Sequence, residues 1–291
     1  MDINTFEQLR DECISKNKKI YEIAQENIAQ SSEISVDEVR AFAKRSLFAM
    51  KEAITTGMSS TELSKSGMCG RDCHRVQQYY KSARPIFGQT FEKIIEYSLA
   101  TSEENIRMGK IVACPTAGSC GILPSTLVAI SEDYNNSERE QIDALITAGE
   151  IGRIISVKVS LAGAVAGCQA ECGTAAAMSA GAICQMRGGN VSQVLNAVAL
   201  AMKNILGLTC DPVAGLVEVP CVKRNPFMAV HSITAVELAL AGVESKIPVD
   251  EVIDAMEQTG ALMSPTLKES SQAGLAVTPT AQFVQKEVFY G

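Results

Sequence analysis

Hydrophobic side chains recur every three to four residues along most of this chain, which is the spacing of amphipathic helices. Three segments begin with a capping box, a Ser or Asn followed three residues later by Glu or Gln: 35–38, 137–140 and 190–193. We expect the third of these helices to end at Gly207 and a fourth to begin near Pro248. Alternating strand patterns are scarce, so the sequence predicts an all-α fold.

The segment 161–182, LAGAVAGCQAECGTAAAMSAGA, consists mainly of Ala, Gly and Ser. Small side chains let helix backbones approach closely, so we expect a buried helix pair in a tight core. The same composition would also let a bulky group lie against the backbone. No linker-like tract or internal repeat divides the chain. We therefore expect a single helical domain over residues 1–291, with Gly- and Ser-rich loops at helix ends and a peripheral helical segment at 1–60.

Composition and charge narrow the class of protein. The 291 residues are 46% hydrophobic and 20% charged, which is typical of an ordered globular protein. A net charge of −7 without a basic stripe argues against nucleic-acid binding. The apolar run at 159–168 is about half the ~20 residues that span a bilayer, and the start of the chain lacks the apolar core of a secretory signal. We expect a cytoplasmic protein with reduced thiols, bound to neither nucleic acid nor membrane.

Ten cysteines and only two histidines make thiolates the favoured metal ligands. No C-x-x-C pair is present, and a free cysteine often behaves as a small buried hydrophobe. Cys168, Cys210 and Cys221 have Gly or Pro residues beside or near them, as in turns that expose side chains at element ends. Their separations fit no common local metal motif, so spacing alone leaves both interpretations open.

Two further segments are rich in Gly and hydroxyl side chains. The segment 114–125, CPTAGSCGILPS, precedes an apolar helical run and could present backbone amides to an anion. It lacks the lysine of a P-loop, so a small carboxylate fits better than a nucleotide, and a purely structural turn is equally compatible. The segment 64–72, SKSGMCGRD, is a second turn of this kind and is ambiguous by itself.

These segments occur in a fixed order, together with GCQAECG at 167–173, CDPVAGLVEVPCVKRN at 210–225 and GLAVTPT at 274–280. In combination they resemble the alpha chain of the iron–sulfur-dependent L-serine dehydratases. The resemblance implies a [4Fe–4S] cluster held by the cysteines of the GCQ, CDPV and VPC motifs, which are Cys168, Cys210 and Cys221 here. Cys172 competes for the first position, although the family pattern places the ligand before Gln.

The resemblance also implies the reaction. Three protein ligands leave one of four irons open as a Lewis acid for the hydroxyl of L-serine, which would lose water to give pyruvate and ammonia without pyridoxal phosphate. A cysteine desulfidase-like lyase on the same scaffold is an alternative. A non-catalytic iron–sulfur subunit and a helical interaction protein with merely buried cysteines are two others.

Candidate residues around the substrate come from the same motifs. Candidates for a proton-transfer role are Ser64, Lys65 and Ser66, whereas His74 and His231 lie outside the recognised pattern. The resemblance implies a separate beta chain that forms a heterodimer with this chain and supplies a histidine. Because the sequence does not end in cysteine, we do not expect a terminal thiol to cap the open iron. Candidates for binding the substrate are Thr116, Ala117, Gly118, Ser119, Gly121, Arg224 and Asn225.

Overall fold

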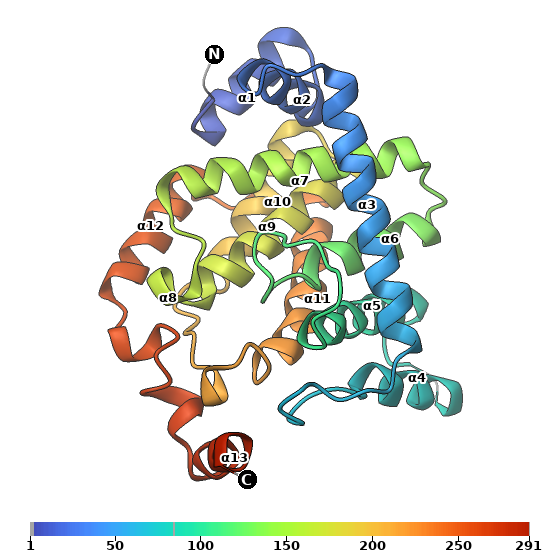
Figure 1. Ribbon diagram of the computed structural model, residues 1–291. Helices are drawn as coiled ribbons and strands as arrows, with labels where there is room; N and C mark the ends of the chain where they lie inside the picture. The colour runs from blue at the N-terminus through green and yellow to red at the C-terminus, as the bar shows by residue number, and fades with distance from the viewer. Residues whose placement is uncertain (1–2, 84, 291) are drawn as a thin grey trace.

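The computed structural model describes residues 3–83 and 85–290, which form helices joined by short segments (Figure 1). The predicted all-α fold is confirmed, because the described residues contain isolated β-bridges but no strand. None of the described helices is long and apolar enough to cross a membrane. The α-helices are α1 (Phe6–Lys16), α2 (Ile20–Ser31), α3 (Val36–Ser59), α4 (Asp72–Ser82), α5 (Gln89–Ile106), α6 (Ile122–Asp133), α7 (Glu138–Lys158), α8 (Gly163–Ala166), α9 (Cys168–Met186), α10 (Val191–Lys203), α11 (Cys221–Leu240), α12 (Val249–Leu262) and α13 (Pro279–Tyr290). The 3₁₀ helices are η1 (Val213–Gly215), η2 (Pro265–Leu267) and η3 (Gly274–Val277).

The helix starts are where the capping boxes predict them. The side chains of Ser35, Ser137 and Asn190 accept hydrogen bonds from the amides three residues ahead, at the starts of α3, α7 and α10. Pro248 directly precedes α12. These confirmed starts follow from contacts within one turn of the chain, which is why the local sequence reveals them.

The expected end of α10 at Gly207 is wrong, because the helix stops at Lys203. The segment that follows is bound to the start of α9 instead of continuing the helix. The amide of Gly207 donates to Gln169 Oε1 at 2.8 Å, and the amide of Gln169 donates to Leu208 O at 3.0 Å. This long-range pairing satisfies polar groups that another helical turn would have used.

Helix α9 lies at the centre of the molecule, surrounded by α6, α7, α10 and α11 (Figure 1). The expected helix pair in the Ala/Gly segment is wrong: the short α8 breaks at Gly167, whose φ is +77°, and one long buried helix follows. Its small residues permit close packing, since a Cβ at Gly181 would lie 2.2 Å from Ile151 Cδ1. Hydroxyls join it to both sides, with Ser179 Oγ 2.7 Å from Thr126 Oγ1 and 2.8 Å from Ser232 Oγ.

The N-terminal helices pack onto this core. Phe6, Leu9 and Ile23 are almost fully buried and belong to the same hydrophobic cluster as α9. The amide of Ile20 donates to Gln185 Oε1 near the end of α9, at 3.2 Å. The division into one domain over 1–291 with a peripheral segment at 1–60 stays a prediction.

Replacing Gly57 by Ala tests the packing of α3 on α5. A Cβ at this position would lie 2.1 Å from the carbonyl oxygen of Ala100, so the two backbones would have to separate. We expect Gly57→Ala to lower the free energy of unfolding by about 2 kcal/mol, measured by denaturant titration. Gly149→Ala on α7 is the control, because that position has no neighbouring atom within 4 Å. For Gly149→Ala we expect the free energy of unfolding to rise by about 0.5–1 kcal/mol. Equal changes for the two variants would contradict the close contact between Gly57 and Ala100.

Candidate functional site

The three cysteines singled out from the sequence lie at the ends of structural elements. Cys168 is the first residue of α9 and Cys221 is the first residue of α11. Cys210 lies before η1, where its amide donates to Leu267 O at 2.9 Å. The expectation that these turns expose the thiols is wrong, since all three cysteines are buried. The Met263 side chain packs against the turn beside Cys168, since a Cβ on Gly167 would lie only 2.8 Å from it.

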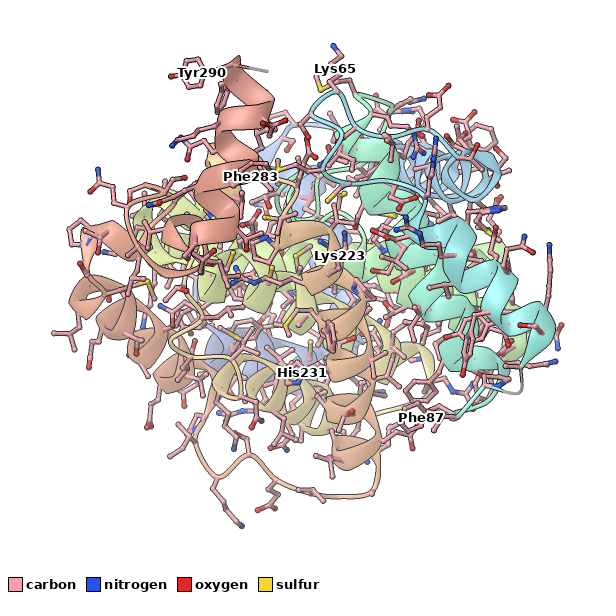
Figure 2. All side chains as sticks on the ribbon, turned by 90° about the horizontal axis from the view of Figure 1, so that it is seen from below. Lys65, Phe87, Lys223, His231, Phe283 and Tyr290 are labelled. Carbon is pink, nitrogen blue, oxygen red and sulfur yellow. The ribbon has the colours of Figure 1, made fainter. Side chains whose placement is uncertain are left out.

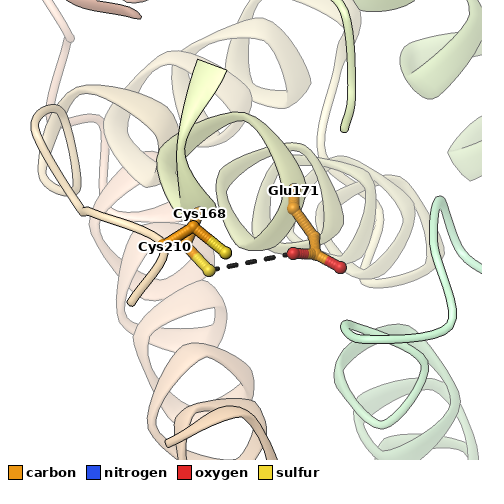
Figure 3. A group of neighbouring side chains, drawn as sticks. All are labelled: Cys168, Glu171 and Cys210. Carbon is orange, nitrogen blue, oxygen red and sulfur yellow. Dashed lines mark hydrogen bonds between the residues drawn. The ribbon is translucent and has the colours of Figure 1, made fainter. Parts of the chain in front are cut away.

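Two of these thiols converge with a carboxylate. The Sγ atoms of Cys168 and Cys210 and a carboxylate oxygen of Glu171 all lie within 4.8 Å of one another (Figure 3). Cys168 Sγ is 3.7 Å from Glu171 Oε2. Cys168 and Glu171 share the first turn of α9, and residues three apart lie on the same face of a helix. The start of the central helix thus brings two chemically different ligand groups to one point.

The electrostatics of this group favour a single negative charge on Cys168. Hydrogen bonds with the thiols of Cys172 and Cys210, together with the positive charge of Arg224, lower the pKa of Cys168 to about 3. The interaction with Cys168 and burial raise the pKa of both Cys172 and Cys210. Burial, followed by the charge on Cys168, raises the pKa of Cys221. Four thiols therefore influence one another, and the negative charge on Cys168 disfavours ionisation of the other three.

Glu171 is affected by the same neighbours. Burial, followed by the negative charge on Cys168, raises the pKa of Glu171 to about 7. Its second oxygen, Oε1, accepts a hydrogen bond from the Thr116 hydroxyl. A Cβ on Gly118 would lie 2.4 Å from that oxygen, so a side chain at this position would displace the carboxylate from its present place. Glu171 therefore links the thiols to the loop at 116–121.

The donor set fits an iron–sulfur cluster. Thiolates are the ligands that such clusters prefer, and Cys168, Cys210 and Cys221 would supply three of them from separate parts of the chain. Both α9 and α11 begin at one of these cysteines without a side-chain cap, so their first amides and positive ends lie beside the thiols. This environment suits a group that carries negative charge.

Arg224, a predicted substrate-binding residue, is held by the cysteine-containing segment. Its guanidinium donates to Thr209 O at 2.9 Å and to Asp211 Oδ1 at 2.8 Å. The other oxygen of Asp211 accepts from the Leu275 amide at 2.8 Å, so the pair also holds η3. A contact between Arg224 and the substrate stays a prediction.

Asn225, another predicted substrate-binding residue, fixes the shape of the turn at 116–121. Its side-chain amide donates to Gly118 O at 2.8 Å and to Cys221 O at 2.9 Å, and its oxygen accepts from the Gly121 amide at 2.9 Å. Asn225 is only 1% exposed. One buried side chain thus joins the candidate substrate loop to the start of α11.

The turn carries backbone donors without partners. Within the described residues, the amides of Ala117, Gly118 and Ser119 donate no hydrogen bond. Ser119 is fully buried, and a buried amide without an acceptor is rare in folded proteins. The turn directly precedes α6, whose N-terminal end adds partial positive charge. These donors can therefore bind a small anion.

The predicted residues at 64–66 lie in a second loop, which is bound to Glu218. The hydroxyls of Ser64 and Ser66 donate to Glu218 Oε2 at 2.6 Å and 2.7 Å and are 3.0 Å from each other. Lys65 between them is exposed, and its side chain points away from the molecule (Figure 2). Ser64, Ser66 and Glu218 form a connected group that does not include Lys65.

The histidines have no role in these clusters. His231 lies on α11 away from Lys65 (Figure 2), and its Nε2 is 2.8 Å from Ala201 O. His74 lies on α4. The bond of His231 agrees with the expectation of a helix residue whose polar group is satisfied, and the lack of a role for His74 stays a prediction.

Three acidic residues of the site were missed by the sequence interpretation, which concentrated on cysteines. Glu171 lies inside the GCQAECG segment, and Asp211 and Glu218 lie inside the segment 210–225. The signal for Glu171 was its position three residues after Cys168 at a helix start. Nothing in the local sequence indicates that Glu218 meets Ser64, because these residues are far apart along the chain.

Comparison with known proteins identifies relatives over most of the chain. The sequence model of one family, described as serine dehydratase alpha chain, matches residues 15–276. A probable L-serine dehydratase alpha chain of Bacillus subtilis is 42% identical over 96% of this chain and 93% of its own length. An L-serine dehydratase alpha chain of Peptoniphilus asaccharolyticus is 38% identical over 98% of both chains. A probable L-serine dehydratase alpha chain of Latilactobacillus sakei is 47% identical over 67% of this chain and 93% of its own length.

Replacing Asn225 by Asp tests whether this side chain holds the turn. Aspartate has the same shape but cannot donate to the carbonyls of Gly118 and Cys221, and it brings a charge into a buried position. We expect Asn225→Asp to lower the free energy of unfolding by about 2–3 kcal/mol in denaturant titration. Asn4→Asp, at an exposed position, is the control and should change it by less than about 0.5 kcal/mol. Equal midpoints for the two variants would refute the bridging role of Asn225.

Proposed function

The chain belongs to the serine dehydratase alpha chain family, and from this membership we propose that it eliminates water from L-serine to give pyruvate and ammonia. The observation that carries the proposal is the group formed by Cys168, Cys210 and Glu171 at the start of α9. Thr116, on the anion-binding turn, is hydrogen-bonded to that same carboxylate. A metal-binding group in contact with a turn that can receive a carboxylate suits the dehydration of a hydroxy amino acid.

We propose that Cys168, Cys210 and Cys221 hold a [4Fe–4S] cluster. When bound with three protein ligands, such a cluster supplies a Lewis-acidic iron that makes a hydroxyl group a better leaving group. The positive ends of α9 and α11 would stabilise the negative charge of such a group. Cys172, one turn after Cys168 on α9, is assigned to hydrogen bonding with Cys168 and not to metal binding.

The chain's own residues would bind and orient the substrate. The free amides of Ala117, Gly118 and Ser119 would receive the carboxylate of L-serine, and Asn225 keeps them in position. Thr116 fixes the adjacent carboxylate of Glu171, so the turn and the thiols keep a constant separation. Holding the two ends of a small substrate in this way lowers the entropic part of the activation barrier.

We assign the removal of the Cα proton to the side of the site that carries Ser64 and Ser66. Both hydroxyls point their hydrogens at Glu218, so either one can accept a proton on its oxygen while passing its own to the carboxylate. Lys65 stays outside this relay. The relatives are named alpha chains, and we propose that a beta chain completes the enzyme as a heterodimer.

Anaerobic purification with the beta chain tests the proposed function. We expect a brown protein with iron and inorganic sulfide that produces pyruvate from L-serine, and we expect colour and activity to disappear together in air. Pyruvate formation is followed by a coupled spectrophotometric assay, with L-cysteine as the competing substrate. A metal-free anaerobic preparation, or turnover of L-cysteine alone, would refute the proposal.

Single Cys→Ser variants test the ligand assignment. Cys168→Ser, Cys210→Ser and Cys221→Ser should each lose bound iron, because a neutral hydroxyl cannot replace a thiolate ligand. Cys172→Ser is the control and should retain iron, because it removes only a hydrogen-bonding partner of Cys168. Iron is measured per chain after anaerobic purification, and circular dichroism shows whether each variant folds. If Cys172→Ser lost its iron and Cys168→Ser retained it, Cys172 would be the cluster ligand and the assignment of Cys168 would be wrong.

A further inference from the structure

Three thiolates for four irons leave one iron without a protein ligand, and the structure suggests a group on this chain that can fill that place. The inference rests on the proposed function, since it needs the cluster to be bound. Among the acidic residues of the site, Asp211 is paired with Arg224 and the Leu275 amide. Glu218 is bound by two serine hydroxyls. Glu171 remains, with one oxygen directed toward the thiols.

Glu171 lacks the positive partner that a partly buried carboxylate normally has. Its hydrogen-bonding neighbours are the Thr116 hydroxyl and Cys168 Sγ. The charged groups that act on it are Cys168 and Glu269, and both are negative. Within the described residues, no lysine or arginine forms an ion pair with it. An open iron of the proposed cluster would give this carboxylate a positively charged partner by direct coordination.

The surroundings fix the direction of this carboxylate. Thr116 binds Oε1, which leaves Oε2 directed at Cys168. Glycines line the space on both sides: a Cβ on Gly118 would lie 2.4 Å from Oε1, and a Cβ on Gly163 would lie 3.3 Å from Oε2 and 2.9 Å from Cys210 Sγ. The two glycines therefore leave room for the Glu171 carboxylate beside the two thiols.

We infer that the Glu171 carboxylate is the protein ligand of the fourth iron when no substrate is bound. Carboxylate oxygen is a weaker partner for this iron than thiolate, so an oxygen of L-serine can take its place without any transfer of electrons. Thr116 retains its hydrogen bond to Oε1 and keeps the released carboxylate from moving into the substrate position. The ligand set at rest is then three thiolates and one carboxylate.

The test measures the rate at which the fourth iron is lost from the enzyme purified anaerobically with its beta chain. Mild oxidation removes this iron first, and the three-iron product is detected by EPR. We expect Glu171→Gln to lose the fourth iron about tenfold faster than the wild type, because an amide is a poor iron ligand. Glu171→Asp keeps the carboxylate, so its rate of iron loss should lie between those of the wild type and Glu171→Gln. Mössbauer spectra of ⁵⁷Fe-loaded protein should show a change at one iron in Glu171→Gln.

Glu269→Gln is the matched control, because it removes a negative charge that acts on Glu171 and Cys210 but is not part of the thiol group. It should keep the wild-type rate of iron loss. Equal rates and equal spectra for wild type and Glu171→Gln would overturn the inference while leaving the proposed function intact. A wild type without any cluster would overturn both. Loss of all iron from both Glu171→Gln and Glu171→Asp would contradict the assignment of Glu171 as a ligand of the fourth iron alone.

Discussion

Helix α9 can occupy the centre of the molecule only because its side chains are small. Four other helices approach it closely, and positions such as Gly181 leave no room for even one additional carbon atom. A helix packed this tightly cannot shift along its axis, so its first turn is fixed in space. That turn carries Cys168 and Glu171. The packing of the core therefore determines where the thiols and the carboxylate lie.

Polar side chains connect the remaining parts of the site to this fixed point. Asn225 joins the start of α11 to the turn at 116–121, and Thr116 joins that turn to Glu171. Glu218 holds the serine loop against the segment between Cys210 and Cys221. Each connection is short, and most are at least partly buried, so water competes with them weakly. The site is rigid because segments distant in sequence share these hydrogen-bonded side chains.

Much of the fold could be predicted from the sequence, because capping boxes act within a single turn. The start of α3 after Ser35 is fixed by a capping box with Glu38, three residues later. The end of α10, in contrast, depends on Gln169, more than thirty residues earlier. The positions of the thiols at element ends were also predictable from neighbouring Gly and Pro residues. Their burial was not, because it depends on contacts between distant segments, such as that of Met263 with Gly167 beside Cys168. Acidic residues were overlooked for the same reason: the partners of Glu218 and Asp211 are far away in the chain.

The pairing of Asp211 has a consequence for the C-terminal part of the described chain. One carboxylate binds Arg224 beside the thiols and the amide of Leu275 in η3, which directly precedes α13. Two segments that share one carboxylate are thermodynamically coupled, and such coupling is reciprocal. Whatever orders the segment of Cys210 also orders η3, and whatever immobilises η3 favours the ordered form of the Cys210 segment. The position of α13, which follows η3, is thereby coupled to the position of the Cys210 thiol.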